Sequence, residues 1–338
     1  MTASDSVARM SMAGAVKSAL DTALTVDDKV LLLGEDIADP AGGVFKVTSG
    51  LSTKHGTTRV RATPIAEQAI IGASIGAALG GYRTVAEIMF FDFVTVAMDQ
   101  LVNHAAKLRY MTGGATPVAL TVRTTIGSSR FGAQHAQELE AWFMHTPGIK
   151  VVMPSSPAEA KGLLLSCIFD PDPCLFIEHS GLLFSPKEEV PLGDVRVPLG
   201  QASIRREGDD VTLVTYGSQV RVAMGAAEQL AGQGINAEVI DLRCLVPLDA
   251  ATVLRSVAKT RRGAVLHAAT AFCGPGAEIA SIITEALFGQ LRGPVVRLGA
   301  ANTPVPFAEG LVTVPTVDSV VTAVRGMFWP GGPYHGPG

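Results

Sequence analysis

Glu67 is an acidic side chain in a stretch that is otherwise small and apolar. Thr63 and Pro64 have the residue types of a helix N-cap and a first helical position. The glutamate of a capping box would follow the cap by three residues, at Ala66, so Glu67 has no capping role. Helical spacing places it on one face with Ile70, Ile71 and Ser74. A buried carboxylate needs a specific partner, which is either structural, such as backbone or an arginine, or a ligand.

His135 is a second residue suited to proton transfer, because histidine exchanges protons near neutral pH. It follows the apolar run 117–123, which is typical of a buried strand, and Gly127 and Gly132 give its loop conformational freedom. Open α/β sheets bind ligands at the carboxyl ends of their strands. A surface or helix-capping histidine is the structural alternative, and position in a loop by itself favours that alternative.

Further candidates lie at the ends of predicted strands. Phe90, Phe91 and Phe93 follow such a strand and could support a planar ligand ring, although aromatic clusters more often belong to the core. His267 ends another predicted strand, which is suggestive but not sufficient for a functional role. His145 directly precedes a strand, which favours a structural role.

Short apolar runs alternate with helical patterns along the chain, which predicts α/β structure with parallel strands covered by helices. In the first half, the predicted strands are 29–34, 84–90, 117–123, 149–153 and 174–178, and the predicted helices lie near 13–24, 65–80, 94–112 and 157–169. In the second half, the predicted strands are 211–216, 237–241, 263–268 and 294–298, and the predicted helices are 219–232, 248–259, 276–288 and 316–328.

The stretch 184–203 interrupts this alternation with prolines, glycines and charged residues, which are typical of a linker. A chain of 338 residues is also too long for one ordinary core. We therefore expect a larger α/β domain at 1–185, a linker at 186–203, a smaller α/β domain at 204–330 and a tail at 331–338.

Composition and motifs exclude several classes of protein. A net charge of −4 gives no electrostatic basis for binding nucleic acid or a membrane surface. No apolar run reaches the roughly 18–20 residues of a membrane span and no signal peptide is evident, so we expect a cytoplasmic protein. The four cysteines lack CxxC spacing and are expected to be buried thiols. There is no P-loop and no GxSxG elbow, and no GxGxxG follows the first strand.

Seven stretches, taken together and in this order, resemble one known family. They are GEDIADPAGGVFKVTSGL (34–51), TPIAEQAIIG (63–72), AEIMFFDF (86–93), DQLVNHAAKLRYMTGG (99–114), AQHAQELEAWFMHTPGIKVVMP (133–154), EAKGLLLSCIFDPDPCLF (159–176) and RLGAANTPVPFA (297–308). The chain is identified by them as similar to the β subunit of the thiamin-diphosphate-dependent decarboxylating component of 2-oxo-acid dehydrogenase complexes. Pyruvate, branched-chain and acetoin dehydrogenases belong to this family, and the resemblance runs from about residue 10 to 328.

The resemblance implies a pyrimidine-binding transketolase-like parallel-sheet domain followed by a smaller transketolase C-terminal-type domain. It implies that Glu67 contacts the aminopyrimidine ring of thiamin diphosphate and exchanges a proton with it. Phe93 matches the aromatic residue that packs on that ring, and Met89 matches a residue of the same pocket. A glutamate poised by burial suits such a proton relay.

The resemblance also implies roles for residues further along the chain. His135 matches the active-site histidine, which would stabilise or protonate the intermediate and guide acyl transfer to a lipoyl group. His267 matches a second histidine found in some branches, with a role toward the substrate. Four residues match a loop that binds a monovalent cation, such as K+, mostly through main-chain carbonyls: Leu120, Cys167, Asp170 and Asp172.

The sequence departs from the family pattern around the substrate. Ala136 stands where a serine often follows the histidine, and Ala268 stands where several members have glutamate. The loop 124–134 is one residue shorter than in pyruvate-type members and carries Ser128, Ser129 and Arg130. Asp172 stands where some members have asparagine. These differences leave cofactor activation intact and leave the acyl substrate and acceptor open.

The GDG motif that holds diphosphate and Mg2+ in this family is missing, and GDD at 208–210 reads as a turn. A diphosphate needs a metal and a polar cradle. We therefore expect this chain to bind only the pyrimidine half of the cofactor. An α subunit would hold the diphosphate and Mg2+, in a heterotetramer of two α and two β chains.

The expected function is decarboxylation of a 2-oxo acid and acyl transfer to a lipoylated protein, by an enzyme active only with its α subunit. The shortened loop motivates an alternative in the same class, a carboligase or acyltransferase of a biosynthetic pathway. A non-catalytic structural subunit is the alternative from another class, and the presence of both Glu67 and His135 argues against it.

Overall fold

The computed structural model describes the chain except for residues 1–5, 128–130, 309 and 329–338. The chain forms two compact units, one of residues 1–128 and 142–199 and the other of residues 129–141 and 200–338. The tail expected at 331–338 and the loop residues Ser128, Ser129 and Arg130 lie outside the described residues.

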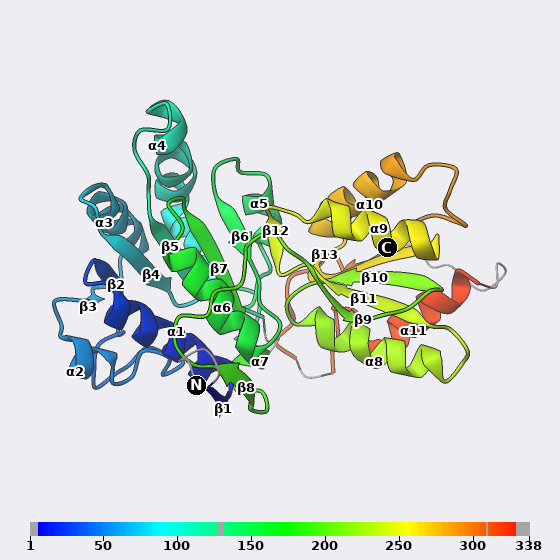
Figure 1. The fold of residues 1–338 in the computed structure, drawn as a ribbon, viewed down its shortest axis with the longest axis horizontal. Helices are drawn as coiled ribbons and strands as arrows, with labels where there is room; N and C mark the ends of the chain where they lie inside the picture. Colours follow the sequence, from blue (N-terminus) through cyan, green and yellow to red (C-terminus); the bar gives the residue numbers. More distant parts are fainter. Residues whose placement is uncertain (1–5, 128–130, 309, 329–338) are drawn as a thin grey trace. The chain divides into compact units, whose positions relative to one another are not determined.

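The first unit is built on a parallel sheet with the strand order β6-β7-β5-β4-β2-β3 (Figure 1). Its strands are β2 (Val30–Glu35), β3 (Val60–Thr63), β4 (Arg83–Ile88), β5 (Leu120–Ile126), β6 (Lys150–Val152) and β7 (Cys174–His179). All seven residues of β5 are buried, which fits a central strand covered on both faces.

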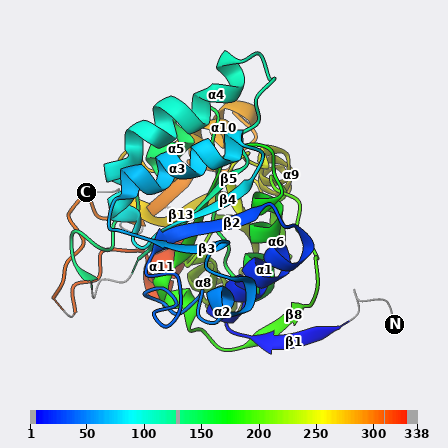
Figure 2. The same cartoon turned by 90° about the vertical axis from the view of Figure 1, so that its left-hand side faces the viewer.

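Helices cover both faces of this sheet. The helices of this unit are α1 (Met12–Val26), α2 (Leu51–His55), α3 (Glu67–Leu79), α4 (Ala106–Met111), α6 (Pro157–Ile168) and α7 (Ser180–Leu183). Helix α5 (Glu140–Met144) begins in the residues of the second unit and ends in those of the first. In Figure 2, α3 and α4 lie on one side of strands β2 and β4, and α1 and α6 lie on the other. Helices α1 and α6 pack on each other, and α3 packs on β4.

Two helix predictions for this unit need correction. The helix expected to begin at Pro64 begins at Glu67, after an Ala66 N-cap that makes no side-chain hydrogen bond. The chain is held extended up to Thr63 because β3 pairs with β2 as far as that residue. The helix expected near 94–112 is three pieces, a 3-10 helix at Phe91–Ala97, a π-helix at Gln100–Ala105 and α4. The β-branched run at 94–96 disfavours a continuous α-helix there.

The stretch expected to be a linker is not entirely irregular. It contains β8 (Glu188–Pro191), which pairs antiparallel with β1 (Val7–Met10) at the start of the chain. Strand β9 (Ser203–Arg206) begins at its end. Neither partner of the β1–β8 ribbon is long enough to show a periodic pattern, and the pairing joins opposite ends of the first unit.

The second unit has a sheet of strand order β14-β13-β10-β11-β9, in which only the β9 pairing is antiparallel among those described. The further strands of this sheet are β10 (Val211–Thr215), β11 (Ala237–Asp241), β13 (Gly263–Thr270) and β14 (Val296–Ala300), and the short strand β12 (Cys244–Val246) lies outside it. Its helices are α8 (Gln219–Ala231), α9 (Ala250–Thr260), α10 (Pro275–Ala286) and α11 (Val317–Gly326). Figure 1 shows α9 and α10 on one face of the sheet and α8 and α11 on the other.

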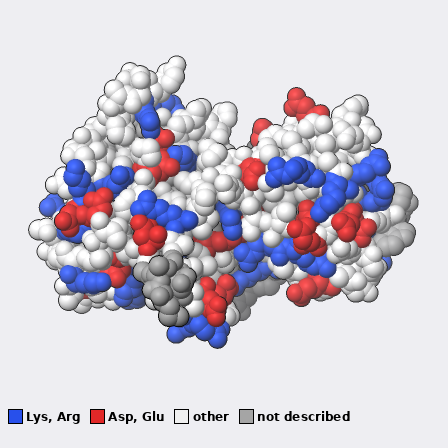
Figure 3. All heavy atoms as spheres, viewed as in Figure 1, with Lys and Arg blue, Asp and Glu red and all other residues white. Residues whose placement is uncertain are grey.

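The surface is mixed in charge. On the face shown in Figure 3, positive and negative side chains are interspersed over both units. In the described part of the chain, no helix is both long enough and apolar enough to cross a membrane. All four cysteines are free thiols; three are buried as expected, but Cys273 is exposed in the turn before α10, where its φ of 54° marks a left-handed residue.

Candidate active site

Two carboxylates meet where β2 ends and α3 begins in the first unit. Glu35 is the last residue of β2 and Glu67 the first of α3, and their exposed fractions are 7% and 9%. The Ala66 backbone N–H donates to Glu35. Within the described residues, Oε1 of Glu35 is buried without a hydrogen-bond partner. The expected face of Glu67, Ile70, Ile71 and Ser74 is confirmed, since all four are buried.

Glu35 is a site residue that the sequence analysis missed. Burial raises the pKa of its carboxyl, and the nearby charges of Glu67 and Asp36 raise it further. The available signal was its place at the end of an apolar strand, but any strand-end acid shows that pattern. Its buried setting lies beside the start of α3, which is at Glu67, three residues after the expected start at Pro64.

The residues after β4 provide an apolar wall at the same edge of the sheet. Met89, Phe90 and Phe93 are partly buried. The Phe90 ring meets Phe93 edge-on at 6.4 Å between centroids and Phe45 at 5.8 Å. Phe91 instead points into the core, where it is fully buried and stacks on another phenylalanine. The cluster therefore divides into one core ring and a wall of partly exposed rings.

A buried network of ion pairs connects three adjacent central strands of the same sheet, β4, β5 and β7. Arg123 on β5 donates to Glu178 on β7 at 2.6 and 3.0 Å and to Glu87 on β4 at 2.6 Å. Burial alone would lower the pKa of Arg123, but the two carboxylates raise it overall. Burial raises the pKa of Glu178 against the opposing effect of Arg123. The guanidinium is thus held charged between two acids.

The implied cation loop comprises Leu120, Cys167, Asp170 and Asp172. Asp170 accepts hydrogen bonds from Lys150 Nζ at 2.5 Å and from the Asp172 backbone at 2.9 Å. Asp172 accepts from Arg109 at 2.6 Å. Both carboxylates are therefore already paired with cationic side chains, so a monovalent cation here would need main-chain carbonyls as its ligands. Among the described residues, no cluster of three or more His, Cys, Asp or Glu side chains could hold a metal ion.

His135 lies in the part of the second unit that comes from residues 129–141. It is partly buried, and its backbone N–H makes a long bond to Gly132 O at 3.4 Å. Ala136, one of the departures from the family pattern, is 2% exposed, so its methyl group fills a buried position. Glu140 is fully buried and accepts a hydrogen bond from the Tyr216 hydroxyl at 2.7 Å.

His267 lies inside β13, not at the end of a strand as expected, and is 1% exposed. Its Nδ1 bonds Ala269 O at 2.9 Å, and Nε2 has no hydrogen-bond partner in the described structure. A Cβ added at Gly274, Gly276 or Gly299 would come within 2.6–2.8 Å of the ring. Burial lowers the pKa of His267 to about 4, so the ring is neutral at neutral pH.

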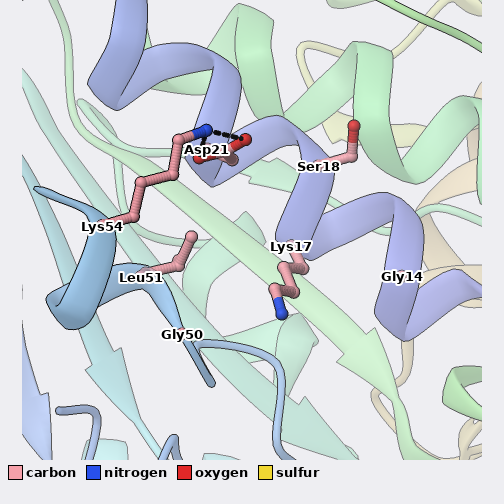
Figure 4. Close-up of a pocket in the computed structure, with 7 residues that line it drawn as sticks. All are labelled: Gly14, Lys17, Ser18, Asp21, Gly50, Leu51 and Lys54. Atoms are coloured by element: carbon pink, nitrogen blue, oxygen red, sulfur yellow. Dashed lines mark hydrogen bonds and ion pairs between the residues drawn. The ribbon is translucent and has the colours of Figure 1, made fainter. Parts of the chain in front are cut away.

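A pocket of about 340 Å³ lies between α1 and α2 in the first unit (Figure 4). Its lining includes Lys17 and Lys54. The Lys54 ammonium is bound to Asp21 at 2.7 Å, as the dashed lines in Figure 4 show. None of the candidate catalytic, cofactor-binding or cation-binding residues lines it.

Comparisons with known proteins agree with this architecture. The family models "Transketolase, pyrimidine binding domain" and "Transketolase, C-terminal domain" match residues 8–185 and 200–318. Among solved structures, a split-gene transketolase described as an inactive beta4 tetramer superimposes with a TM-score of 0.77 at 23% identity, covering 94% of this chain and 98% of that one. At this identity the likeness is one of fold alone, and it confirms the expected fold class.

Curated relatives are more similar in sequence. The acetoin:2,6-dichlorophenolindophenol oxidoreductase subunit beta of Bacillus subtilis (strain 168) is 43% identical, covering 93% of this chain and 95% of its own length. The mitochondrial 2-oxoisovalerate dehydrogenase subunit beta 2 of Arabidopsis thaliana is 43% identical, covering 95% and 90%. The pyruvate dehydrogenase E1 component subunit beta of Staphylococcus epidermidis is 40% identical, covering 90% and 93%. The chain therefore belongs to the transketolase-like family of β subunits of thiamin-diphosphate-dependent 2-oxo-acid dehydrogenases.

Proposed function

We propose that this chain, together with an α subunit, decarboxylates a 2-oxo acid and passes the acyl group to a lipoylated protein. The observation that carries the proposal is the pair of buried carboxylates Glu35 and Glu67, at the carboxyl end of β2 and the start of α3. A structural role would leave both groups paired, whereas Oε1 of Glu35 is buried without a partner among the described residues.

The first unit fits the pyrimidine half of thiamin diphosphate. Glu67 would hold the ring through its carboxylate, and Met89 and Phe93 would cover it. When bound, the cofactor supplies the electron sink for decarboxylation. Glu67 is the first residue of helix α3, so its side chain lies at the N-terminal end of that helix.

The chain's own residues prepare the proton transfer. Glu67 would hold or release a proton at its carboxylate, beside Glu35, whose pKa is raised by burial and by the charge of Glu67. Met89, Phe90 and Phe93 would supply an apolar, partly buried wall for the ring at the same edge of the sheet. His135 would donate a proton near the substrate, and His267 would act toward the substrate from its buried place in β13.

The proposal also includes the partner subunit and the ions that the assembled enzyme would bind. We place the diphosphate and Mg2+ on the α subunit, in an α2β2 heterotetramer that serves a lipoylated acyltransferase core. A K+ ion would be bound by main-chain carbonyls of the loop at Leu120, Cys167, Asp170 and Asp172. We also propose domain boundaries at 185 and 204 and a cytoplasmic location.

The relatives are named for acetoin, 2-oxoisovalerate and pyruvate. Ala136 and the loop 124–134 motivate the second candidate, a carboligase that gives the activated acyl group to another acceptor. Carbon–carbon coupled product formed without a lipoyl domain would favour that candidate.

The test uses the chain co-expressed with its α subunit. Thiamin diphosphate binding, carbon dioxide release and reduction of 2,6-dichlorophenolindophenol are measured with pyruvate, branched-chain 2-oxo acids and acetoin. Glu67→Gln is expected to abolish turnover, by at least about 100-fold, because one positioned acid–base group contributes roughly that factor. Gln68→Ala, on the exposed neighbour, is the matched control and should keep activity. Turnover retained in Glu67→Gln would refute the proposed role, and absent cofactor binding in the two-chain assembly would favour a structural subunit.

A further inference from the structure

We infer that Glu140 and Tyr216 are positioning residues for His135. Their hydrogen bond anchors the segment 131–139, which carries His135, to the sheet of the second unit. The inference rests on the proposed function only in giving His135 a catalytic role, because the anchoring itself is a property of the chain.

The bond between Glu140 and Tyr216 is fully buried. The Tyr216 hydroxyl donates to Glu140 Oε1 at 2.7 Å, with exposed fractions of 3% for tyrosine and 0% for glutamate. The other carboxyl oxygen, Oε2, is buried without a partner in the described structure. Tyr216 is the side-chain donor described for this carboxyl group, beside the backbone N–H of Glu140 itself. Losing the hydroxyl would leave the buried acid with fewer hydrogen bonds than it needs.

Tyr216 is itself held rigidly. It directly follows β10, and its ring stacks on His267 of the adjacent strand β13, with centroids 6.2 Å apart and planes 15° from parallel. The histidine is fixed in turn by its bond to Ala269 and by three glycine positions that crowd its ring. Two neighbouring strands thus hold the tyrosine hydroxyl at one place.

The segment 131–139 also contacts the rest of the second unit near its N-terminal end. Gly132, with a φ of 74°, lies against the Phe307 ring, where an added Cβ would be 3.4 Å from the nearest ring atom. Between these two contacts Ala136 is buried and His135 is partly buried. His135 therefore lies between a packing contact three residues before it and a hydrogen bond five residues after it.

In the hydrogen bond between these two residues, Tyr216 is the donor and Glu140 is the acceptor. Burial raises the pKa of Tyr216, and Glu140 raises it further, so the hydroxyl keeps its proton. Burial also raises the pKa of Glu140. Nearby His267 is neutral, and Glu138 also acts on Tyr216 with its negative charge. No charged partner competes with the tyrosine in the contacts described for Glu140.

The experiment is hydrogen–deuterium exchange of peptides covering 131–139 in the full chain, alone and assembled with its α subunit. Tyr216→Phe is expected to increase exchange in this segment about tenfold, the factor that corresponds to one buried hydrogen bond. Thr212→Val is the matched control, because Thr212 lies on the same strand and its hydroxyl bonds Ser256 and Thr260 at 2.7 and 2.8 Å. It should lower the melting temperature without changing exchange at 131–139.

Two substitutions of Glu140 test the same hydrogen bond in case the Tyr216→Phe chain does not fold. Glu140→Gln keeps an acceptor oxygen and should preserve protection of the segment, whereas Glu140→Ala should lose it. In the assembled enzyme, Tyr216→Phe should lower kcat about tenfold with KM changed less than twofold, since the cofactor-binding unit is untouched. Unchanged exchange in Tyr216→Phe, or an equal increase in Thr212→Val, would overturn the inference. If His135→Ala retains full turnover while the exchange results hold, the proposed catalytic role of His135 fails and the anchoring stands.

Discussion

Replacing Arg123 by methionine tests whether the buried ion network holds the first unit together. Methionine keeps most of the apolar volume of the arginine stem but removes the guanidinium. The change leaves Glu178, which is fully buried, and Glu87, whose side chain is 12% exposed, without their shared cation. All three residues lie on adjacent central strands, so the loss is felt in the middle of the sheet.

The expected loss of stability follows from the geometry. Three short hydrogen bonds of 2.6, 2.6 and 3.0 Å disappear, each made to a carboxylate in a buried setting. Breaking a buried ion pair on one side costs about 3–5 kcal/mol, because the remaining charge is left uncompensated. For a unit of this size, each kcal/mol lowers the melting temperature by about 2–4 °C, so we expect a decrease of about 6–20 °C.

The assay is urea and thermal denaturation of the Arg123→Met chain at neutral and mildly acidic pH. Burial already raises the pKa of Glu178 in the native state, and removing Arg123 raises it further. A raised carboxyl pKa means that stability is lost as pH rises, so the deficit of the variant should shrink as pH falls. The double variant Arg123→Met/Glu178→Gln should regain part of the loss. A deficit below about 1 kcal/mol, or one independent of pH, would refute the reasoning.

Two further predictions concern Glu35 and the turn before β6. Because burial raises the pKa of Glu35 above 4.5, its contribution to stability is lost as pH rises. Glu35→Gln should therefore melt higher than the wild type at about pH 8, with the difference vanishing in acid; an unchanged pH profile would contradict this. At Gly148, with a φ of 101°, an added Cβ would lie 1.9 Å from Ala106 O, so Gly148→Ala should cost about 3 kcal/mol or more in urea denaturation. Gly81→Ala, at a similar φ of 87° but with open space, is its control and should cost only about 1 kcal/mol.

Much of the fold was predictable because it depends on local pattern. Alternating apolar runs and helical periodicity gave the order of most strands and helices, and residues such as Val211–Thr215 form a strand as expected. The burial of Glu67 followed from helical spacing alone. The start of its helix did not, because Thr63 is held in a strand by pairing with β2, a contact outside the local sequence. The ribbon of β1 and β8 escaped prediction for the same reason.

The sequence by itself determined the class of fold, the family and the residues suited to proton transfer, since residue type and spacing along the chain carry that information. Only the tertiary structure decided their partners. Arg123 meets Glu178 across 55 residues, and Tyr216 meets Glu140 across 76. Glu35, the last residue of β2, is buried near Glu67, the first residue of α3, although 32 positions separate them in the chain. Such pairs depend on strand order and register, which arise when the whole chain buries its apolar faces and which no local pattern encodes.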